Sequence, residues 1–489
     1  MFIGLDIGTS GVRGIAVEHD GPVVAEATAP LETGHPHPGW SEQDPCSWIS
    51  ACETVMRNLG VRVGSKFSGV AGIGLSGHMH GATLLDADDR PLRPCILWND
   101  TRSAAEAAAL DAQPVLRQAS ANIVFPGFTA PKLLWVKEHE PEVFAKVAKV
   151  LLPKDFVRLW LTGLHQSDMS DSAGTSWLNV GAREWSDVAL AASGMRRDQM
   201  PDLVEGSAAG GHVRQALCDS WGIDGPVVVA GGAADNAAAA CGIGCLNEGE
   251  GFVSLGTSGV LLAARDGFAP APETAVHTFC HAVPDRWYQM GVILSATDSL
   301  NWLASALKAD AVELASALPG RISGPSSTLF LPYLSGERTP HNDATIRGAF
   351  LGLDIATTPT DLTQSVMEGV AFALRDSHEA LRSTGADLQR VFAVGGGSRS
   401  RFWLETLATV LGLPISVPKA GELGAALGAA RLAICASTGA SPDEVMTSPP
   451  VAEWIAPRAD LTAAYDAAYQ RYRAAYPAIR EVMANQPIA

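Results

Sequence analysis

The chain has 489 residues, of which 47% are hydrophobic and 18% are charged, and its formal net charge is −17. This length exceeds the size at which one hydrophobic core stops growing, so we expect two domains, and the composition excludes a disordered chain. The negative charge argues against nucleic acid and against an anionic membrane surface as partners. Residues 1–5 read as a strand rather than a leader, and no stretch approaches ~18 consecutive apolar residues, so we expect a cytoplasmic protein. The eight cysteines are scattered, which predicts buried, reduced thiols.

In chain order, short apolar runs alternate with segments of helical spacing, which indicates an α/β protein with parallel or mixed sheets. The first half has predicted strands at residues 1–5, 14–18, 70–75, 82–86 and 225–232 and predicted helices at residues 103–112, 130–139, 155–161 and from Asp235 onward. The second half has predicted strands at residues 252–255, 260–264 and 390–394 and predicted helices at residues 299–308 and 360–383. Small and polar residues interrupt the pattern between 242 and 250, so we expect domains of residues 1–244 and 245–489.

One pentapeptide, Gly-Thr-Ser-Gly-Val, occurs at residues 8–12 and again at residues 256–260. Each copy lies between two apolar runs, a pattern that predicts a strand, a tight turn and a second strand. Such a turn presents backbone N–H groups and hydroxyls to one side, which suits a phosphate chain. Either copy alone could be an ordinary hairpin, but the pair favours two related domains that clasp a nucleotide.

Two carboxylates stand at the ends of predicted strands. Asp6 directly precedes the first glycine turn, where it would repel phosphate unless a cation lay between them, so it indicates Mg²⁺ held directly or through water. Asp235 starts an alanine-rich helix, whose dipole and free N–H groups would keep it ionised and able to accept a proton from a substrate hydroxyl. The alternatives are a turn-forming Asp6 and a purely structural helix cap at Asp235. Phosphoryl transfer to an alcohol needs one carboxylate near the metal and one near the acceptor, so the two turns favour the catalytic interpretation.

Three further segments offer polar groups to a ligand. In Gly-His-Met-His-Gly, residues 77–81, the two histidines could form a metal pair, but no third ligand is near, and a polar lining with Met79 as an apolar face fits better. The segment Trp-Asn-Asp-Thr-Arg, residues 98–102, suits a polyol, and its alternative is a capped helix start. The segment Gly-Gly-Gly-Ser, residues 395–398, follows a strand and would let backbone approach an adenosine closely.

Taken together, these segments resemble the carbohydrate kinases of the FGGY family, from residue 1 to about residue 433. The matching segments include Gly-Leu-Asp-Ile-Gly-Thr-Ser-Gly at residues 4–11 and those at residues 40–45, 79–86, 96–100, 128–133, 152–155, 167–171 and 331–341. The resemblance implies two actin-like (ribonuclease H-like) domains that close over a sugar and MgATP in a central cleft. It also implies ATP-dependent phosphorylation of D-xylulose at O5 in pentose catabolism, and it allows a homodimer.

By the same resemblance, Asp235 would take the proton from the C5 hydroxyl of the ketose, and Asp6 would serve the metal and the phosphates. The residues expected at the sugar, from the resemblance and from the segments above, are Met79, His80, Trp98, Asp100 and Asn236. Those expected at the nucleotide are Gly8, Thr9, Ser10, Arg13, Gly256, Thr257, Ser258, Gly396, Gly397 and Ser398.

Three residues depart from the family pattern. His78 stands where glutamine is usual, Arg13 where lysine is commoner, and Ala234 where glycine is commoner. The first bears on sugar preference, and the third removes backbone freedom next to Asp235. Two alternatives stay open: another acceptor such as ribulose or arabinitol, and an actin-like ATP-binding protein without a transfer step.

Overall fold

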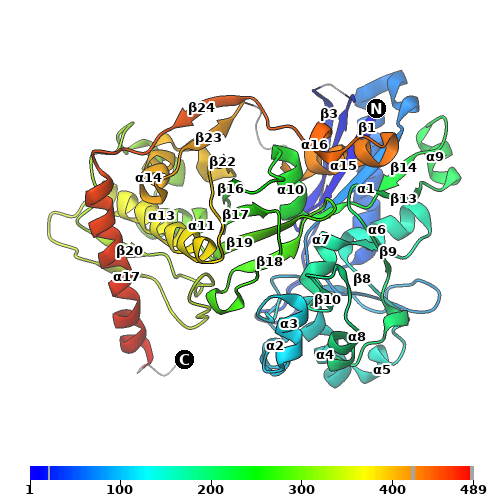
Figure 1. The fold of residues 1–489 in the computed structure, drawn as a ribbon, viewed down its shortest axis with the longest axis horizontal. Helices are drawn as coiled ribbons and strands as arrows, with labels where there is room; N and C mark the ends of the chain where they lie inside the picture. Colours follow the sequence, from blue (N-terminus) through cyan, green and yellow to red (C-terminus); the bar gives the residue numbers. More distant parts are fainter. Residues whose placement is uncertain (20–21, 420–423, 485–489) are drawn as a thin grey trace.

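The computed structural model describes residues 1–19, 22–419 and 424–484. It contains two seven-stranded mixed sheets, one from each half of the chain, with helices packed around them (Figure 1). Helix α10 (Asp235–Ile243) lies between the two sheets in this view. The α/β class predicted from the sequence is therefore observed in both halves.

The first sheet has the strand order β13-β14-β5-β1-β2-β3, and β15 also pairs with β5. Its strands are β1 (Phe2–Ile7), β2 (Gly11–Val17), β3 (Val23–Pro30), β5 (Gly72–Gly77), β13 (Ala209–His212), β14 (Val228–Ala230) and β15 (Ala233–Ala234). Strand β1 runs antiparallel to β2 and parallel to β5, and β14 runs parallel to β5. The strand predicted at residues 225–232 is shorter in the structure, because the chain turns into a loop after Ala230.

The second sheet repeats this arrangement with the order β18-β19-β17-β16-β22-β23-β24. Its strands are β16 (Glu250–Leu255), β17 (Gly259–Arg265), β18 (His277–Cys280), β19 (Trp287–Ile293), β22 (Arg390–Val394), β23 (Ile415–Pro418) and β24 (Val451–Ile455). Strand β16 is antiparallel to β17 and parallel to β22, as β1 is to β2 and β5. Each Gly-Thr-Ser-Gly-Val segment thus forms the turn of the central hairpin of its sheet, as the repeat predicted.

Each helix predicted from the sequence is present, with small shifts at its ends. The helices of the first half besides α10 are α1 (Pro45–Val63), α2 (Ala104–Asp111), α3 (Pro114–Ser120), α4 (Thr129–His139), α5 (Pro141–Phe144), α6 (Pro153–Thr162), α7 (Met169–Ser172), α8 (Asp187–Ala192) and α9 (Gln215–Trp221). Those of the second half are α11 (Thr297–Leu307), α12 (Ala311–Ser316), α13 (Pro359–Ser383), α14 (Arg401–Leu411), α15 (Gly424–Thr438), α16 (Pro442–Val445) and α17 (Thr462–Ala484).

Short two-stranded ladders lie outside the two large sheets. They are formed by β4 (Glu42–Gln43) with β7 (Cys95–Ile96), β6 (Thr83–Leu85) with β8 (Lys149–Leu151), β9 (Gln166–Asp168) with β12 (Asp202–Val204), β10 (Leu178–Asn179) with β11 (Glu184–Trp185), and β20 (Leu329–Leu331) with β21 (Ala349–Leu351).

Helix α15 belongs to the second half of the sequence but covers the first sheet. A Cβ added at Gly74 of β5 would lie 1.8 Å from the carbonyl oxygen of Ala429, and one added at Gly428 would lie 1.7 Å from that of Ala238 in α10. Only glycine allows backbones to approach this closely. The helix therefore ties the second half of the chain to both the first sheet and α10.

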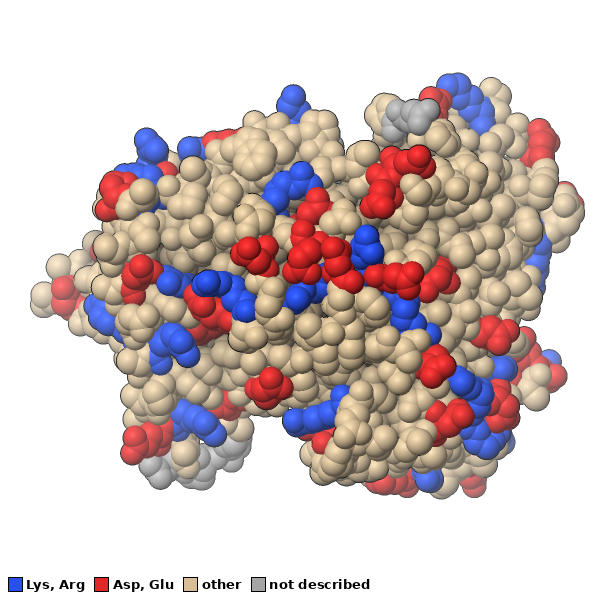
Figure 2. All heavy atoms as spheres, in the orientation of Figure 1, with Lys and Arg blue, Asp and Glu red and all other residues tan. Residues whose placement is uncertain are grey.

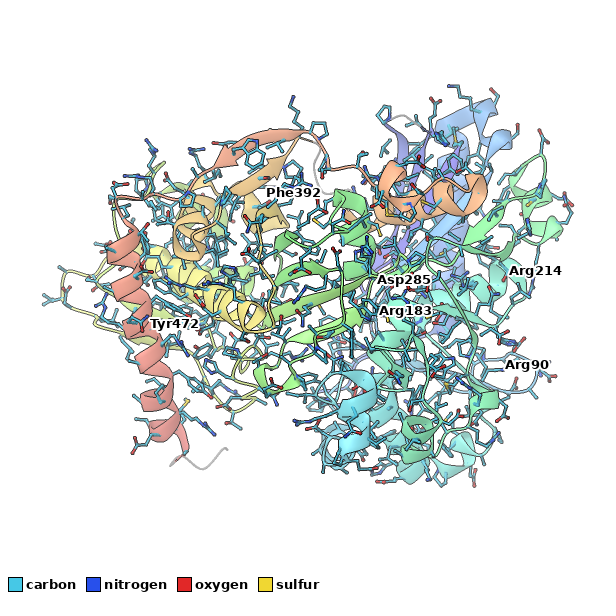
Figure 3. All side chains as sticks on the ribbon, in the orientation of Figure 1. Arg90, Arg183, Arg214, Asp285, Phe392 and Tyr472 are labelled. Carbon is cyan, nitrogen blue, oxygen red and sulfur yellow. The ribbon has the colours of Figure 1, made fainter. Side chains whose placement is uncertain are left out.

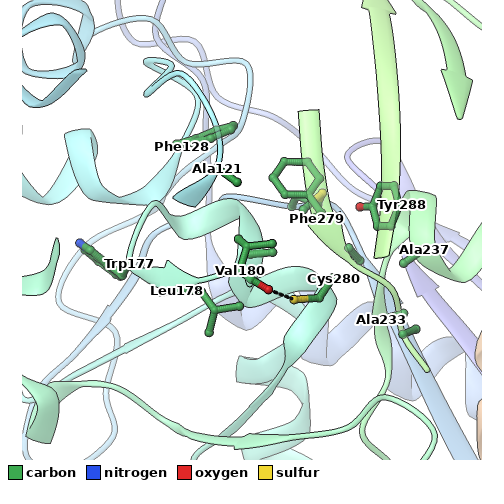
Figure 4. Close-up of a cluster of buried hydrophobic side chains, with 14 of the residues drawn as sticks. Ala121, Phe128, Trp177, Leu178, Val180, Ala233, Ala237, Phe279, Cys280 and Tyr288 are labelled. Atoms are coloured by element: carbon green, nitrogen blue, oxygen red, sulfur yellow. Dashed lines mark hydrogen bonds between the residues drawn. The ribbon is translucent and has the colours of Figure 1, made fainter. Parts of the chain in front are cut away.

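A shared hydrophobic core joins the two halves on the side of β18 and β19. Phe279 and Tyr288 of these strands are buried with Phe128 and Ala237 from the first half (Figure 4). At the edge of this core, Arg183 donates hydrogen bonds to Glu205 and to backbone carbonyls of the turn between β18 and β19, where it lies next to Asp285 (Figure 3). The halves thus contact each other through apolar side chains and through hydrogen bonds from Arg183 to backbone carbonyls.

The negative net charge of the sequence predicts a surface without a broad basic patch. On the face shown in Figure 2, acidic and basic side chains are interspersed rather than gathered into a broad basic patch. Among the described residues, no helix combines the length and the apolar character needed to span a membrane. The prediction of buried thiols is confirmed for seven cysteines and wrong for Cys46, which is exposed because it lies in the first turn of α1 facing solvent.

Candidate active site

The first glycine turn joins β1 to β2 and is fixed by hydrogen bonds from neighbouring side chains. The amide of Gly8 donates to the carbonyl of Gly11 at 3.0 Å, which closes the turn. Gln43 Nε2 donates to the carbonyl of Thr9 at 2.6 Å, and Trp98 Nε1 donates to Thr9 Oγ1 at 3.0 Å. Ser10 is exposed at the tip of the turn. The turn is therefore fixed by its neighbours while its tip stays accessible.

The second glycine turn joins β16 to β17 and rests on the start of α11. Thr297 donates to the carbonyl of Gly256 through its amide at 2.9 Å and through its hydroxyl at 2.7 Å. The amide of Ala296 donates to the carbonyl of Thr257 at 2.8 Å, and Ser258 completes the turn. Because the carbonyls of this turn are bound behind it, its open side can offer N–H groups and hydroxyls to an anion.

Asp6 lies opposite Arg13 of β2 and opposite Ser76 of β5 in the register of the first sheet. Its Oδ1 is buried and has no hydrogen-bond partner among the described residues. Burial raises the pKa of Asp6, while Ser76 and Arg13 act in the opposite direction. Asp6 and Arg13 line a cavity of about 230 Å³ together with Gly395 from the second half. Asp6 thus presents an unused carboxylate oxygen where the two halves meet.

Asp235 is the first residue of α10 and directly follows β15. Its Oδ1 accepts hydrogen bonds from the amide of Asn236 at 2.7 Å and from Asn236 Nδ2 at 2.9 Å. Burial, and after it the charge of Asp6, raise the pKa of Asp235 to about 6. The sequence predicted the helix start correctly, but the favourable effect of the N–H groups on the charged form is smaller than the cost of burial. The carboxylate is still mostly ionised at pH 7.

Met79 and His80 follow β5 in a tight bend. His80 has a φ of 70°, which a side chain other than glycine rarely adopts. Its carbonyl accepts hydrogen bonds from Lys132 Nζ at 2.8 Å and from Thr129 Oγ1 at 3.1 Å, and its Nδ1 lies 2.7 Å from the carbonyl of Gly174. Burial, and after it the charge of Lys132, lower the pKa of His80 to about 3, so the ring is neutral. The bend excludes the extended geometry that a His78–His80 metal pair would need.

Aromatic rings from both halves of the chain surround His80. Its ring stacks on Phe128 with centroids 4.5 Å apart, and Phe279 of β18 lies 6.3 Å away. His277 stacks on Phe279 at 5.4 Å (Figure 4 shows Phe128 and Phe279). His78 has a different environment, because it is buried edge-on against Trp48 under the first sheet. Of the two histidines, only His80 lies where the two halves meet.

Trp98 and Asp100 have different environments although they are near in sequence. The Trp98 side chain is 45% exposed and contacts the first glycine turn through its indole N–H. Asp100 is buried, and its two oxygens accept hydrogen bonds from Arg102 Nε at 2.9 Å, Arg102 Nη2 at 2.7 Å and the amide of Ser41 at 2.6 Å. Its hydrogen-bonding capacity is used inside the protein, so we assign Asp100 to the support of this loop rather than to a ligand.

The glycine segment after β22 borders a larger cavity. Gly396, Gly397 and Ser400 line a hollow of about 550 Å³ between the start of α14 and helices α11 and α12; its other walls include Thr297, Asn301, Leu318, Pro319, Met367 and Trp403. Ser398 turns away and donates through its hydroxyl to the carbonyl of Gly395 at 2.6 Å. A mostly apolar hollow with backbone and a few polar groups at its rim has the character of a nucleoside site.

Sequence reasoning missed two features of this site. Lys132 lies in one of the segments that match the family pattern, but the sequence assigns it no role, because its hydrogen bond to the carbonyl of His80 joins residues 52 positions apart. A lysine on an otherwise apolar helix face was the available signal. Asn301 and the other walls of the 550 Å³ hollow gave no such signal, because four separate segments form them.

The site therefore has four parts: two glycine turns whose carbonyls are bound behind them, two neighbouring carboxylates, a wall of aromatic rings with a neutral histidine, and an apolar hollow. Comparison with known proteins agrees with this arrangement. The N-terminal domain of the FGGY family of carbohydrate kinases matches residues 1–242, and the C-terminal domain of that family matches residues 251–437. The chain belongs to this family and is a carbohydrate kinase, an enzyme class that uses ATP.

Among its relatives, a xylulose kinase of Escherichia coli (strain K12) is 46% identical over 487 residues, which cover 99% of this chain and 100% of that protein. The crystal structure of a "xyloylose kinase" from Brucella ovis is similar with a TM-score of 0.97 and 56% identity, covering 98% of this chain and 99% of that one. The structure of xylulose kinase from Rhodospirillum rubrum has a TM-score of 0.91 and 29% identity, over 99% and 100% of the chains. The predicted family and its actin-like α/β fold are confirmed.

Proposed function

We propose that this carbohydrate kinase transfers the γ-phosphoryl group of ATP to O5 of D-xylulose, with Asp235 as the base. The observation that carries the proposal is the placement of Asp235. Its Oδ1 is held by Asn236, and among the described residues no partner is found for its Oδ2. A carboxylate fixed through one oxygen can receive a proton on the other. The xylulose kinases to which the chain is similar supply the substrate class.

Asp235 orients the attacking hydroxyl and accepts its proton as the bond to phosphorus forms. The transition state of phosphoryl transfer is loose, so positioning and charge neutralisation contribute more than strong basicity. A pKa of about 6 suits this role, because the group is ionised at neutral pH and still basic enough to hold the proton. Asn236 fixes the orientation of the carboxylate and can also contact the sugar.

Asp6 fits a magnesium ion. Its buried Oδ1 lacks a protein partner within the described part of the chain, and carboxylate oxygen is a preferred ligand of Mg²⁺. When bound, Mg²⁺ would neutralise charge on the phosphates. Gly8, Thr9 and Ser10, with Arg13 nearby, would contact the phosphates from the first half, and Gly256, Thr257 and Ser258 would do so from the second.

Met79, His80, Asn236 and the exposed ring of Trp98 would hold the sugar. A neutral His80 and the aromatic rings beside it offer a surface that packs on the C–H faces of a polyol without a charged partner. Gly396 and Gly397 would lie against the nucleoside in the 550 Å³ hollow. We further propose the domain limits 1–244 and 245–489 and a cytoplasmic location. We also propose a homodimer, which gel filtration with light scattering would test.

The test is ADP release by the purified protein with MgATP and a panel of acceptors: D-xylulose, D-ribulose, L-ribulose, D-fructose, glycerol and D-arabinitol. The proposal predicts the highest kcat/KM for D-xylulose and a 5-phosphate product. A higher value for another polyol would retain the kinase and replace the acceptor. A rate that no acceptor raises above the sugar-free rate would contradict the transfer reaction.

A further inference from the structure

A cluster of charged side chains is buried directly behind Asp235 and the 78–80 bend. Lys154, at the start of α6, lies 2.5 Å from Asp155, 2.7 Å from Asp168 and 3.2 Å from Asp171, measured from Nζ to carboxylate oxygens. All four side chains are fully buried. Charges are rarely removed from water this completely unless they are paired, so a cluster of this kind needs a structural or functional reason.

The cluster is connected to Asp235 by a short chain of hydrogen bonds. Asp168 Oδ2 accepts hydrogen bonds from the hydroxyl and the amide of Ser170, the latter at 2.8 Å. Ser170 Oγ in turn accepts a hydrogen bond from the amide of Ala234 at 3.1 Å. Ala234 is the residue before Asp235 and is fully buried. The position of the Asp235 backbone is therefore linked through Ser170 and Asp168 to Lys154.

The same region holds the other end of the loop that leads to Asp235. Arg158, one turn after Lys154 in α6, donates hydrogen bonds to the carbonyls of Ala230 and Gly231. The loop from β14 to α10 is thus bound where it leaves the strand and where it enters the helix. Lys154 also packs against the end of β5, since a Cβ at Gly77 would lie 2.9 Å from Lys154 Cβ. One helix backs both the candidate base and the strand that leads to the sugar-side bend.

We propose that Ser170, supported by Asp168 and Lys154, is a positioning residue that sets the place of the Asp235 carboxylate relative to the acceptor hydroxyl. The proposal rests on Asp235 being the base. Ser170 is fully buried and does not touch a substrate, so it acts only through the amide of Ala234. Phosphoryl transfer depends on alignment within fractions of an ångström, so a small displacement of Asp235 reduces turnover more than binding.

The chain provides a matched control within the same helix. Ser172 is also fully buried in α7, but its hydroxyl donates to Ser167 Oγ at 2.8 Å and has no contact with the Ala234 amide. Ser170→Ala and Ser172→Ala each remove one buried hydroxyl and leave the charges of the cluster in place. They are milder than a change at Lys154, which would remove the cation that lies within 3.2 Å of all three buried carboxylates.

The experiment measures kcat, the KM values for sugar and ATP, D-xylulose binding by calorimetry and the thermal midpoint for wild type and both variants. For Ser170→Ala we expect kcat to fall by roughly 10- to 100-fold, with KM and sugar affinity within about threefold. For Ser172→Ala we expect kcat within about twofold of wild type, with a comparable change in thermal midpoint.

A kcat for Ser170→Ala within twofold of that for Ser172→Ala would overturn the positioning role. If both values had then fallen together with an equal loss of thermal midpoint, the two serines would have only a general effect on folding. Failure of the proposed function is seen separately, because wild type itself would then show no D-xylulose-dependent turnover.

Discussion

Lowering the pH is expected to switch off the base. The pKa of Asp235 is raised to about 6, first by burial and then by the charge of Asp6, while the two N–H groups of Asn236 lower it. A carboxylate that must be ionised to accept a proton loses activity as the pH falls through its pKa. The structure therefore predicts a step in kcat/KM near pH 6, well above the ordinary range of an aspartate.

The size of the step follows from the fraction of Asp235 that is ionised. With a pKa of about 6, about nine-tenths is ionised at pH 7 and about one-tenth at pH 5, so kcat/KM for the sugar should fall about eight- to tenfold between them. An aspartate with the ordinary value of 3.8 would lose less than about a tenth of its activity over the same interval.

The assay is chromatographic measurement of ADP from quenched reactions between pH 4.5 and 8, which avoids coupling enzymes with their own pH dependence. Asp376, in the second half, also has a pKa raised to about 6 by burial, so a change in folding could produce a similar curve. Enzyme held at pH 5 and assayed at pH 7.5 separates the two, because chemistry recovers at once. A profile that is flat from pH 5 to pH 8 would refute the assignment of Asp235 as a titrating base.

Three other predictions concern stability and binding. Because the pKa of Asp235 is raised, its ionised form destabilises the folded state above about pH 6. The variant Asp235→Asn should therefore increase the unfolding free energy at pH 8 by about 1–3 kcal/mol, and by much less at pH 4, as measured by urea denaturation. Equal effects at both pH values would contradict this. Lys132→Met leaves the His80 carbonyl without its Nζ donor, so the KM for sugar should rise by about tenfold and that for ATP by less than threefold, and the reverse order would contradict the role of the bend. A Cβ at Gly396 meets no atom within 4 Å, so Gly396→Ala should keep the thermal midpoint and raise the KM for ATP. A Cβ at Gly397 lies 2.8 Å from a leucine, so Gly397→Ala should lower the thermal midpoint. Unchanged ATP kinetics in Gly396→Ala would argue against a nucleoside next to Gly396.

Local patterns in the sequence predicted the parts of the site that are built by short segments. The repeated pentapeptide predicted both hairpins, because a strand, a glycine turn and a strand are all encoded within about fifteen residues. The helix start at Asp235 was predicted for the same reason, since a buried strand, two glycines and an alanine run specify it locally. The equivalent places of the two hairpins in the two sheets followed from the repeat itself.

Features that depend on distant residues were not predicted. Asp100 was expected at the sugar, but Arg102 and the amide of Ser41, which is 59 residues away, use its oxygens inside the protein. The pKa of Asp235 depends on Asp6, which is far away in sequence and close in space. Helix α15 crosses to the first sheet because Gly74 and Gly428 permit backbone contact, and neither glycine shows this role in its own sequence neighbourhood.

The central claim is that Asp235 is the base in phosphoryl transfer to D-xylulose. The most direct test compares wild type with Asp235→Ala. Turnover with D-xylulose and MgATP is measured next to D-xylulose binding by calorimetry. We predict that wild type turns over D-xylulose and that Asp235→Ala loses at least about 1,000-fold in kcat while binding the sugar within a few fold of wild type. Near-normal turnover by Asp235→Ala would remove this residue from the mechanism and contradict the account.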